Sequence, residues 1–245
     1  MYENSGIQES LAETGWNTGH RTKNRWKTIG KILLLTGSVA GAVLLGKWAL
    51  HFDAGAYTQA VLDAAYRDER ENYQKLTGNS DADVEKLFQK NLDATMDEFQ
   101  TIKLSEAQEE NYRALFQDIL KQVRYTVGEV TAQKGGNYAV QVEVEPMTLF
   151  DDTYDAFQNQ AESYARKVTD EVLNGGQMPE EQEIQSQVYQ IYYDVLRDAL
   201  DSGVKYGKAQ TVTLHVNRKK DGGYEIPEKD ITALNEKLIS REKLE

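Results

Sequence analysis

The chain has 245 residues, of which 40% are hydrophobic and 28% are charged, and its net charge is −12. An acidic balance of this size disfavours contact with nucleic-acid phosphates, so we expect no nucleic-acid partner. The absence of cysteine excludes disulfides, thiolate zinc sites, cysteine nucleophiles and the lipid-modified cysteine of a lipoprotein.

Composition divides the chain into three parts. Residues 1–28 are polar and show no apolar periodicity, whereas residues 29–51 are almost wholly apolar. The remaining residues, 52–245, carry 22 basic and 37 acidic side chains, a net charge of −15, and are strongly patterned. We therefore predict a disordered cytoplasmic tail (1–28), a transmembrane signal anchor (29–51) and an extracytoplasmic domain (52–245).

The stretch "GAVLLGKW", Gly41–Trp48, matches the G-x-x-x-x-G-K frame of phosphate-binding loops. A working loop needs a serine or threonine after the lysine to hold magnesium, and Trp48 stands there instead. The fifteen residues between Lys31 and Lys47 carry no charge, and the two lysines are about 24 Å apart along a helix. A membrane helix explains these residues better than a nucleotide site does.

Basic and aromatic residues flank this apolar segment at both ends. We predict that the membrane interface is lined by Arg25, Trp26, Lys27, Lys31, Lys47 and Trp48. More basic residues precede the segment than follow it, which places the N-terminus in the cytoplasm. The alternative is a signal peptide cleaved near Ala56, within "AGA", which would release a secreted domain. Gly37 and Gly41 form G-x-x-x-G, a spacing that permits self-association of membrane helices.

The first half of the domain alternates between helical and strand periodicity. We predict helices over 57–76, 80–99 and 105–123, the last two opened by capping-box patterns at Ser80 and Ser105. In "YAVQVEVE", residues 138–145, valines alternate with polar residues, as in a strand with one buried face. A weaker strand precedes it, bulged at Gly128 and joined through the "KGGN" turn.

The second half repeats this order. A helix capped by Asp151 or Asp152 runs to the Gly-Gly pair at 175–176, and a second begins with Pro179 in its first turn. The strand "AQTVTLHV", the turn "KKDGGYEI" and a helix after Pro227 follow. The predicted fold class is α+β: one transmembrane helix, then a domain of about six helices packed on a small antiparallel sheet of two hairpins.

The stretch "YTQAVLDAAYRDERENYQKLTGNSDADVEKLF", followed by "KGGNYAVQVEVEP", resembles a group of uncharacterised extracytoplasmic domains of Gram-positive bacteria. Those domains are usually tethered as lipoproteins. The likeness covers most of residues 53–240 but includes no catalytic motif. This chain departs from the usual member because an apolar segment stands where the lipobox cysteine would be. The resemblance implies an envelope location and no particular reaction.

Few residues suggest chemistry. His215 is the one histidine of the domain, and we interpret it as a solvated strand residue. Ser240 and Lys243 fit S-x-x-K without its companion motifs. Among the carboxylates, Asp151 and Asp152 are the leading candidates for a functional role. They fit either a helix cap or an acid–base pair. We predict no catalytic residues, no cofactor and no metal site.

Tyrosines are the compositional oddity, because thirteen of the fourteen follow residue 51. We expect most of them to pack in the core, while Tyr189, Tyr192 and Tyr193 crowd one helical turn. These three, with Asp151 and Asp152, are the candidate ligand or partner surface. The predicted function is a non-catalytic envelope module that binds a protein, peptide or glycan. The alternatives are a carboxylate-dependent envelope hydrolase and a secreted small-ligand-binding domain.

Overall fold

The computed structural model describes residues 52–99, 104–240 and 242–243. The predicted tail and anchor lie outside the described residues, as do the interface residues Arg25 to Trp48 and the Gly37–Gly41 pair. Among the helices that are described, none has both the length and the hydrophobicity needed to cross a bilayer. The anchor and its orientation therefore stay predictions.

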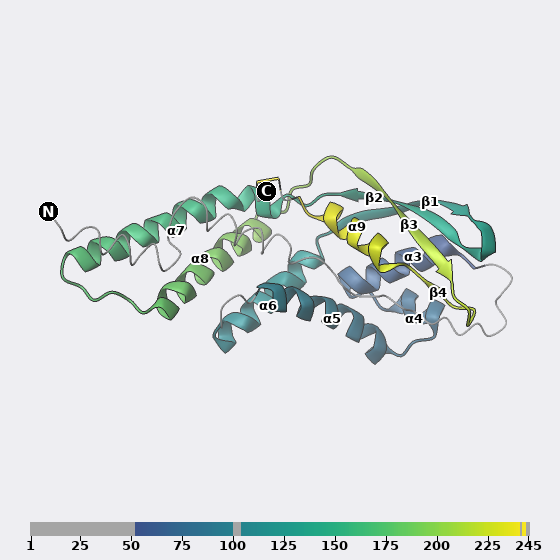
Figure 1. The fold of residues 1–245 in the computed structure, drawn as a ribbon, viewed down its shortest axis with the longest axis horizontal. Helices are drawn as coiled ribbons and strands as arrows, with labels where there is room; N and C mark the ends of the chain where they lie inside the picture. Colours follow the sequence, from purple (N-terminus) through teal and green to yellow (C-terminus); the bar gives the residue numbers. More distant parts are fainter. Residues whose placement is uncertain (1–51, 100–103, 241, 244–245) are drawn as a thin grey trace.

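A four-stranded antiparallel sheet lies in the right half of the molecule as drawn in Figure 1. Its strands, in spatial as well as chain order, are β1 (Arg124–Ala132), β2 (Tyr138–Glu145), β3 (Gln210–Arg218) and β4 (Tyr224–Glu225). Both predicted hairpins are confirmed, and pairing of β2 with β3 joins them into one sheet. The register shifts between Val127 and Val130, which confirms the bulge expected at Gly128.

Apolar and polar residues alternate along the strands, and this alternation determines which face of the sheet is covered. Val140, Val142 and Val144 are fully buried, whereas Gln141 and Glu143 between them are not. The buried face packs against helices from both ends of the domain, α3 and α9. An antiparallel sheet with one covered face is the arrangement that period-two patterning predicts.

The helices surround this face and extend beyond it (Figure 1). In chain order they are α3 (Ala54–Leu62), α4 (Glu71–Thr77), α5 (Asp81–Phe99), α6 (Glu106–Leu120), α7 (Leu149–Leu173), α8 (Glu181–Asp201) and α9 (Glu228–Leu238). At α6 the capping box is present, because Ser105 Oγ accepts from the Gln108 N–H and the Gln108 side chain accepts from the Ser105 N–H. The predicted α+β class is confirmed.

The single helix predicted over 57–76 is wrong, because the structure breaks it in two. After α3 the chain forms a π-helical turn, Asp63–Arg67, and Asp68 then adopts a left-handed conformation at φ 59°. Arg70 binds the Asp68 carboxylate, with Nε 2.7 Å from Oδ1, and so holds this turn. Aspartate tolerates the left-handed region better than most residues, which allows the break without a glycine.

Two helix starts also differ from prediction. α7 begins at Leu149, so Asp151 and Asp152 lie inside its first turn and do not cap it. Their carboxylates still lie at the favourable end of the helix dipole. α8 begins at Glu181, which puts Pro179 before the helix and not in its first turn.

Helices α7 and α8 form an antiparallel hairpin, here called the arm, inserted between β2 and β3 (Figure 1). The base of the arm is closed by backbone hydrogen bonds: Thr148 N–H donates to the Lys205 carbonyl and Gly207 N–H donates to the Pro146 carbonyl. The remaining described elements form the body. The arm projects from the body along the long axis of the molecule.

Tyrosines supply much of the buried volume, as the composition predicts. Five are essentially inaccessible: Tyr57, Tyr66, Tyr73, Tyr112 and Tyr192. Four of their hydroxyl groups lie in the body and one in the arm. Three of these hydroxyl groups donate to other elements: that of Tyr57 to the Tyr224 carbonyl, that of Tyr66 to Asn235 Oδ1 and that of Tyr112 to the Tyr189 carbonyl. These three tyrosines therefore anchor neighbouring elements as well as filling space.

Candidate functional site

The joint between arm and body is a cluster of aromatic rings. Tyr112 of α6 lies against Tyr193, whose ring is 5.6 Å away in an edge-on arrangement, and donates its hydroxyl proton to the Tyr189 carbonyl at 2.5 Å. Tyr192 contacts Phe157 of α7, with ring centroids 5.3 Å apart. The three tyrosines that the sequence singled out therefore hold α8 between α6 and α7.

Burial decides the chemical character of this cluster. Tyr192 is 2% exposed, and burial raises the pKa of Tyr112 and of Tyr192 well above the usual range. Both phenols consequently stay neutral at physiological pH. Tyr189 and Tyr193 are half-buried at the rim of the joint. These two remain the part of the predicted tyrosine surface that a partner can reach.

The other candidate residues meet at the base of the arm. Asp151 is buried and accepts hydrogen bonds from Ser240 Oγ and from the Lys243 backbone N–H, at 2.5 and 3.0 Å. Asp152 is exposed and accepts from Thr148 Oγ1. The Asp151 carboxylate thus ties the C-terminal segment to the first turn of α7.

The same contacts explain the S-x-x-K pair. Lys243 Nζ donates to Asp155 at 2.7 Å, and this hydrogen bond raises the pKa of the Lys243 ammonium. The Ser240 hydroxyl faces Asp151 and not the lysine amine. A general base has to reach the nucleophile it activates, so this arrangement serves as a clasp between distant segments. The expectation that the protein is not an enzyme stays a prediction.

His215 departs from the prediction of a simply solvated side chain. Its backbone N–H donates to Asp230 Oδ2 at 2.7 Å, and its ring Nδ1 lies 2.8 Å from the same oxygen. Asp230 is buried in the first turn of α9. α9 therefore covers the edge of β3 that faces away from β2, at a position where β4 does not pair with it. This cover protects the sheet from edge-to-edge association.

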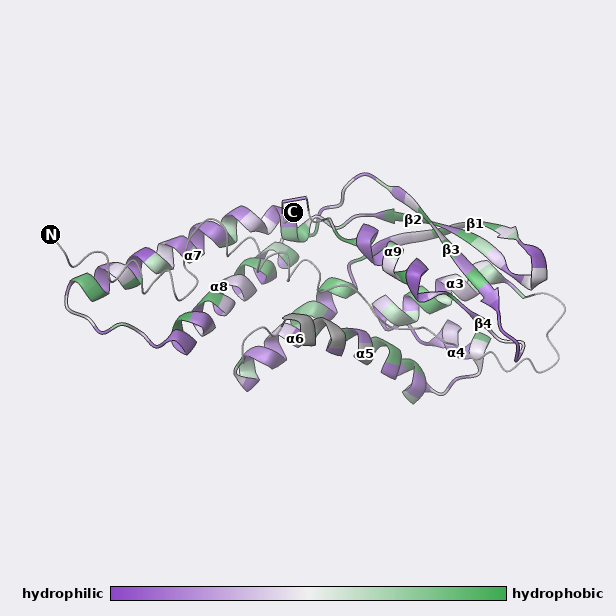
Figure 2. Cartoon of the chain, in the orientation of Figure 1, coloured by the Kyte–Doolittle hydropathy of each residue, from purple (hydrophilic) through white to green (hydrophobic). Residues whose placement is uncertain are grey.

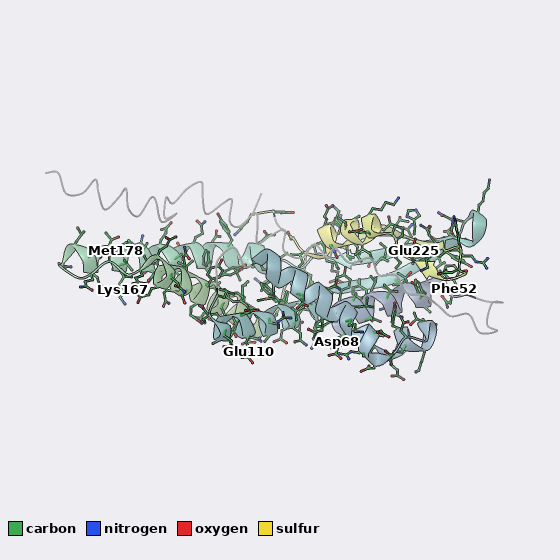
Figure 3. The ribbon with its side chains drawn as sticks, turned by 60° about the horizontal axis from the view of Figure 1, so that its bottom comes forward. Phe52, Asp68, Glu110, Lys167, Met178 and Glu225 are labelled. Atoms are coloured by element: carbon green, nitrogen blue, oxygen red, sulfur yellow. The ribbon has the colours of Figure 1, made fainter. Side chains whose placement is uncertain are left out.

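The far end of the arm exposes apolar side chains. Leu173 is 56% exposed and Met178 is 37% exposed, both in or beside the loop that joins α7 to α8. Figure 3 shows Met178 and Phe52 at opposite ends of the molecule. A protruding end with exposed apolar groups is the feature of the described surface that best fits a binding role.

Two glycines shape this end. Gly175 adopts φ +91°, a conformation that side chains with a Cβ disfavour. At Gly176 a Cβ would lie 2.8 Å from the Glu171 carbonyl oxygen, so only glycine fits. The tight turn leaves an open depression beside the end of α7, lined by Arg166, Lys167, Asp170, Glu171, Gly176 and Gln177 among others.

The arm is also strongly acidic. Residues 149–201 carry twelve acidic and three basic side chains, a net charge of −9. In Figure 2 hydrophobic and hydrophilic residues alternate along α7 and α8, as expected for helices with one packed stripe.

Within the described ranges, no three histidine or carboxylate residues gather as a metal-ligand group. The absence of a metal or cofactor stays a prediction.

Comparison with known proteins gives one informative match. No protein-family model matches the chain, and no curated protein sequence matches it. The fold is similar to the crystal structure of a proposed lipoprotein, YcdA, from Bacillus subtilis subsp. subtilis strain 168. The TM-score is 0.53 at 13% sequence identity, over 76% of this chain and 56% of that one. The match shows a shared fold.

Proposed function

We propose that this chain is a membrane-anchored extracytoplasmic protein that binds a partner, without catalysis, through the tip of its arm. The observation that carries the proposal is the arm itself. Two helices leave the body and end in a loop with Leu173 and Met178 exposed. Apolar groups held away from the body in this way favour association with another surface.

Several observations favour an uncleaved anchor over a secreted domain. A cut after Ala56 would remove Asp53, whose carboxylate caps α3 by accepting the Ala56 N–H at 2.9 Å. It would also remove Ala54, which is buried, and Phe52, which stacks on Tyr224. The residues just before the possible cut are thus part of the folded domain. The description of YcdA as a proposed lipoprotein supports an envelope location by likeness of fold.

The charge of the arm indicates the chemistry of the partner. Residues 162–183, around the tip, carry six acidic and two basic side chains, a net charge of −4. An apolar contact within an acidic surround favours a protein or peptide that presents an apolar side chain among basic ones. Such binding weakens as salt screens the charges.

The test uses the natural absence of cysteine. A Gln177→Cys variant places a single thiol at the tip, to be labelled on intact host cells with a photo-crosslinker that cannot cross membranes. We expect labelling from outside, followed on illumination by an adduct of one defined mass. No labelling of cells that contain the protein would overturn the extracytoplasmic location.

Matched variants test the role of the tip. Adding Leu173→Ala and Met178→Ala to the labelled protein should remove the adduct, whereas Leu76→Ala with Val130→Ala should leave it. All four side chains are exposed apolar groups, and only the first two lie at the tip. An adduct that survives the first pair, or is absent from the labelled parent, would contradict partner binding by the tip.

A further inference from the structure

Two hairpin turns at the end of the body opposite the arm are basic. They are residues 133–137 and 218–223, here called the basic tip. Its charged side chains are Lys134, Arg218, Lys219, Lys220 and Asp221, a net charge of +3 within a domain of −15. Both turns lie at the end of the molecule opposite the tip of the arm (Figure 1).

The fold brings these charges together from two separate turns. Asn137 Oδ1 accepts the Arg218 backbone N–H at 2.8 Å, which links the first turn to the second. A Cβ at Gly136 would lie 3.2 Å from Arg218 Cδ, so the arginine stem crosses directly over that glycine. Asp221 Oδ1 accepts from the Gly223 N–H, which lowers the pKa of this carboxyl, and its Oδ2 lies 3.7 Å from Lys219 Nζ. Lys134 and Lys220 are exposed.

The chain enters the domain beside this basic tip. Phe52 stacks on Tyr224, with ring centroids 3.6 Å apart and planes 3° from parallel, and its centroid is 5.6 Å from that of Tyr138. Tyr138 and Tyr224 are the first residues of β2 and β4, directly after the two turns. Figure 3 shows Phe52 next to Glu225 at this end. Phe52 immediately follows residue 51, where the predicted anchor ends, so an anchor there would place the basic tip close to the bilayer.

We propose that the basic tip docks on anionic lipid headgroups of the membrane that holds the anchor, so that the arm points away from the bilayer. This inference rests on the anchored location proposed above. Basic side chains near an anionic surface are attracted to it, while the arm, at −9, is repelled. Both forces turn the long axis of the molecule outward. The acidic domain as a whole would avoid such lipids, and only this end reverses that preference.

The experiment uses the full-length chain in nanodiscs of phosphatidylglycerol mixed with phosphatidylcholine, or of phosphatidylcholine alone. Gln133→Cys carries a fluorophore at the basic tip, Gln177→Cys carries it at the arm, and a headgroup spin label quenches it. We expect strong quenching at residue 133 in anionic discs, weaker quenching in neutral discs, and none at residue 177. Salt at 1 M, where the screening length is about 3 Å, should reduce the quenching at residue 133 to the neutral-disc level.

Charge reversal provides the decisive variant. Lys134→Glu with Lys220→Glu should lower the ratio of docked to undocked protein by at least about 25-fold, because each of the two basic groups contributes roughly fivefold at an anionic surface. Lys121→Glu with Lys167→Glu makes the same change in net charge at exposed positions away from the basic tip and should leave the quenching intact. Equal quenching in both lipids, or equal loss in both variants, overturns the docking.

Carbonate extraction of the full-length chain reconstituted in vesicles of the same lipids separates the two proposals. Protein that resists carbonate but shows no lipid-dependent quenching is anchored without docking, which refutes this inference alone. Protein that carbonate removes from the bilayer refutes the anchor and with it the docking.

Discussion

The body and the arm bury their side chains in different ways. In the body, the valines of β2 have strands on both sides and helices over one face, and they are inaccessible to solvent. In the arm beyond Phe157, α7 has Val168 as its one buried residue, because α8 is the described element that packs against it there. In a hairpin of two helices, each helix buries only the stripe of side chains that faces the other helix. Stability is therefore concentrated in the body, while the arm keeps surface free for a partner.

Leucine truncation should separate the two regions most strongly. Leu214→Ala leaves a cavity in the inaccessible centre of the sheet, so we expect the free energy of unfolding to fall by about 2–5 kcal/mol. Leu173→Ala at the exposed tip should change it by less than about 0.5 kcal/mol. Urea unfolding followed by circular dichroism measures both. Similar losses in the two variants would mean that the tip is packed and the comparison fails.

A truncation inside the arm should act locally. Ile184→Ala removes a buried contact between α8 and α7, and we expect a loss of about 2 kcal/mol that opens the distal arm alone. Amide hydrogens of residues 164–185 should then exchange roughly thirtyfold faster, with those of β2 unchanged. Gln182→Ala, at an exposed position nearby, is the control. Faster exchange in β2 as well would show that arm and body unfold as one unit.

The joint should give a smaller effect. Tyr112→Phe keeps the ring packing and removes the hydrogen bond to the Tyr189 carbonyl, so we expect a loss of about 1 kcal/mol in unfolding free energy. Tyr206→Phe removes a hydroxyl contact to the Gln122 carbonyl outside the joint. Only the first variant should speed exchange in α8. If both speed it equally, the Tyr112 hydroxyl does not specifically couple arm to body.

The sequence predicts the elements whose signals are local. Val140, Val142 and Val144 alternate with polar residues, and Ser105 and Gln108 stand at capping-box spacing, so neither depends on the rest of the fold. The break at Asp68 is different. Arg70 holds Asp68 while also contacting Asp81 and Glu85 of α5, and only the folded chain brings these groups together.

The candidate sites also divide into features with a local sequence signal and features that only the folded chain creates. Periodicity places His215 on the polar face of its strand but says nothing of Asp230, which α9 brings to it. The arm tip had a local signal, since Leu173 lies just before a Gly-Gly turn and off the packed stripe. For the basic tip, the sequence carried only part of the signal. The turns "KGGN" and "KKDGG" are readable, but only the register of β2 with β3 sets them side by side.

The position of the arm between β2 and β3 has a consequence for folding kinetics. Pairing Val144 with Gln210 requires closure of the segment between them, residues 145–209, which is 65 residues long, at a large entropic cost for a flexible chain. A helical hairpin forms from contacts close in sequence and delivers Met147 next to Tyr206. We expect early formation of the arm to bring β2 and β3 close together and so to speed their pairing. Weakening the arm should then slow refolding even where equilibrium stability is little changed.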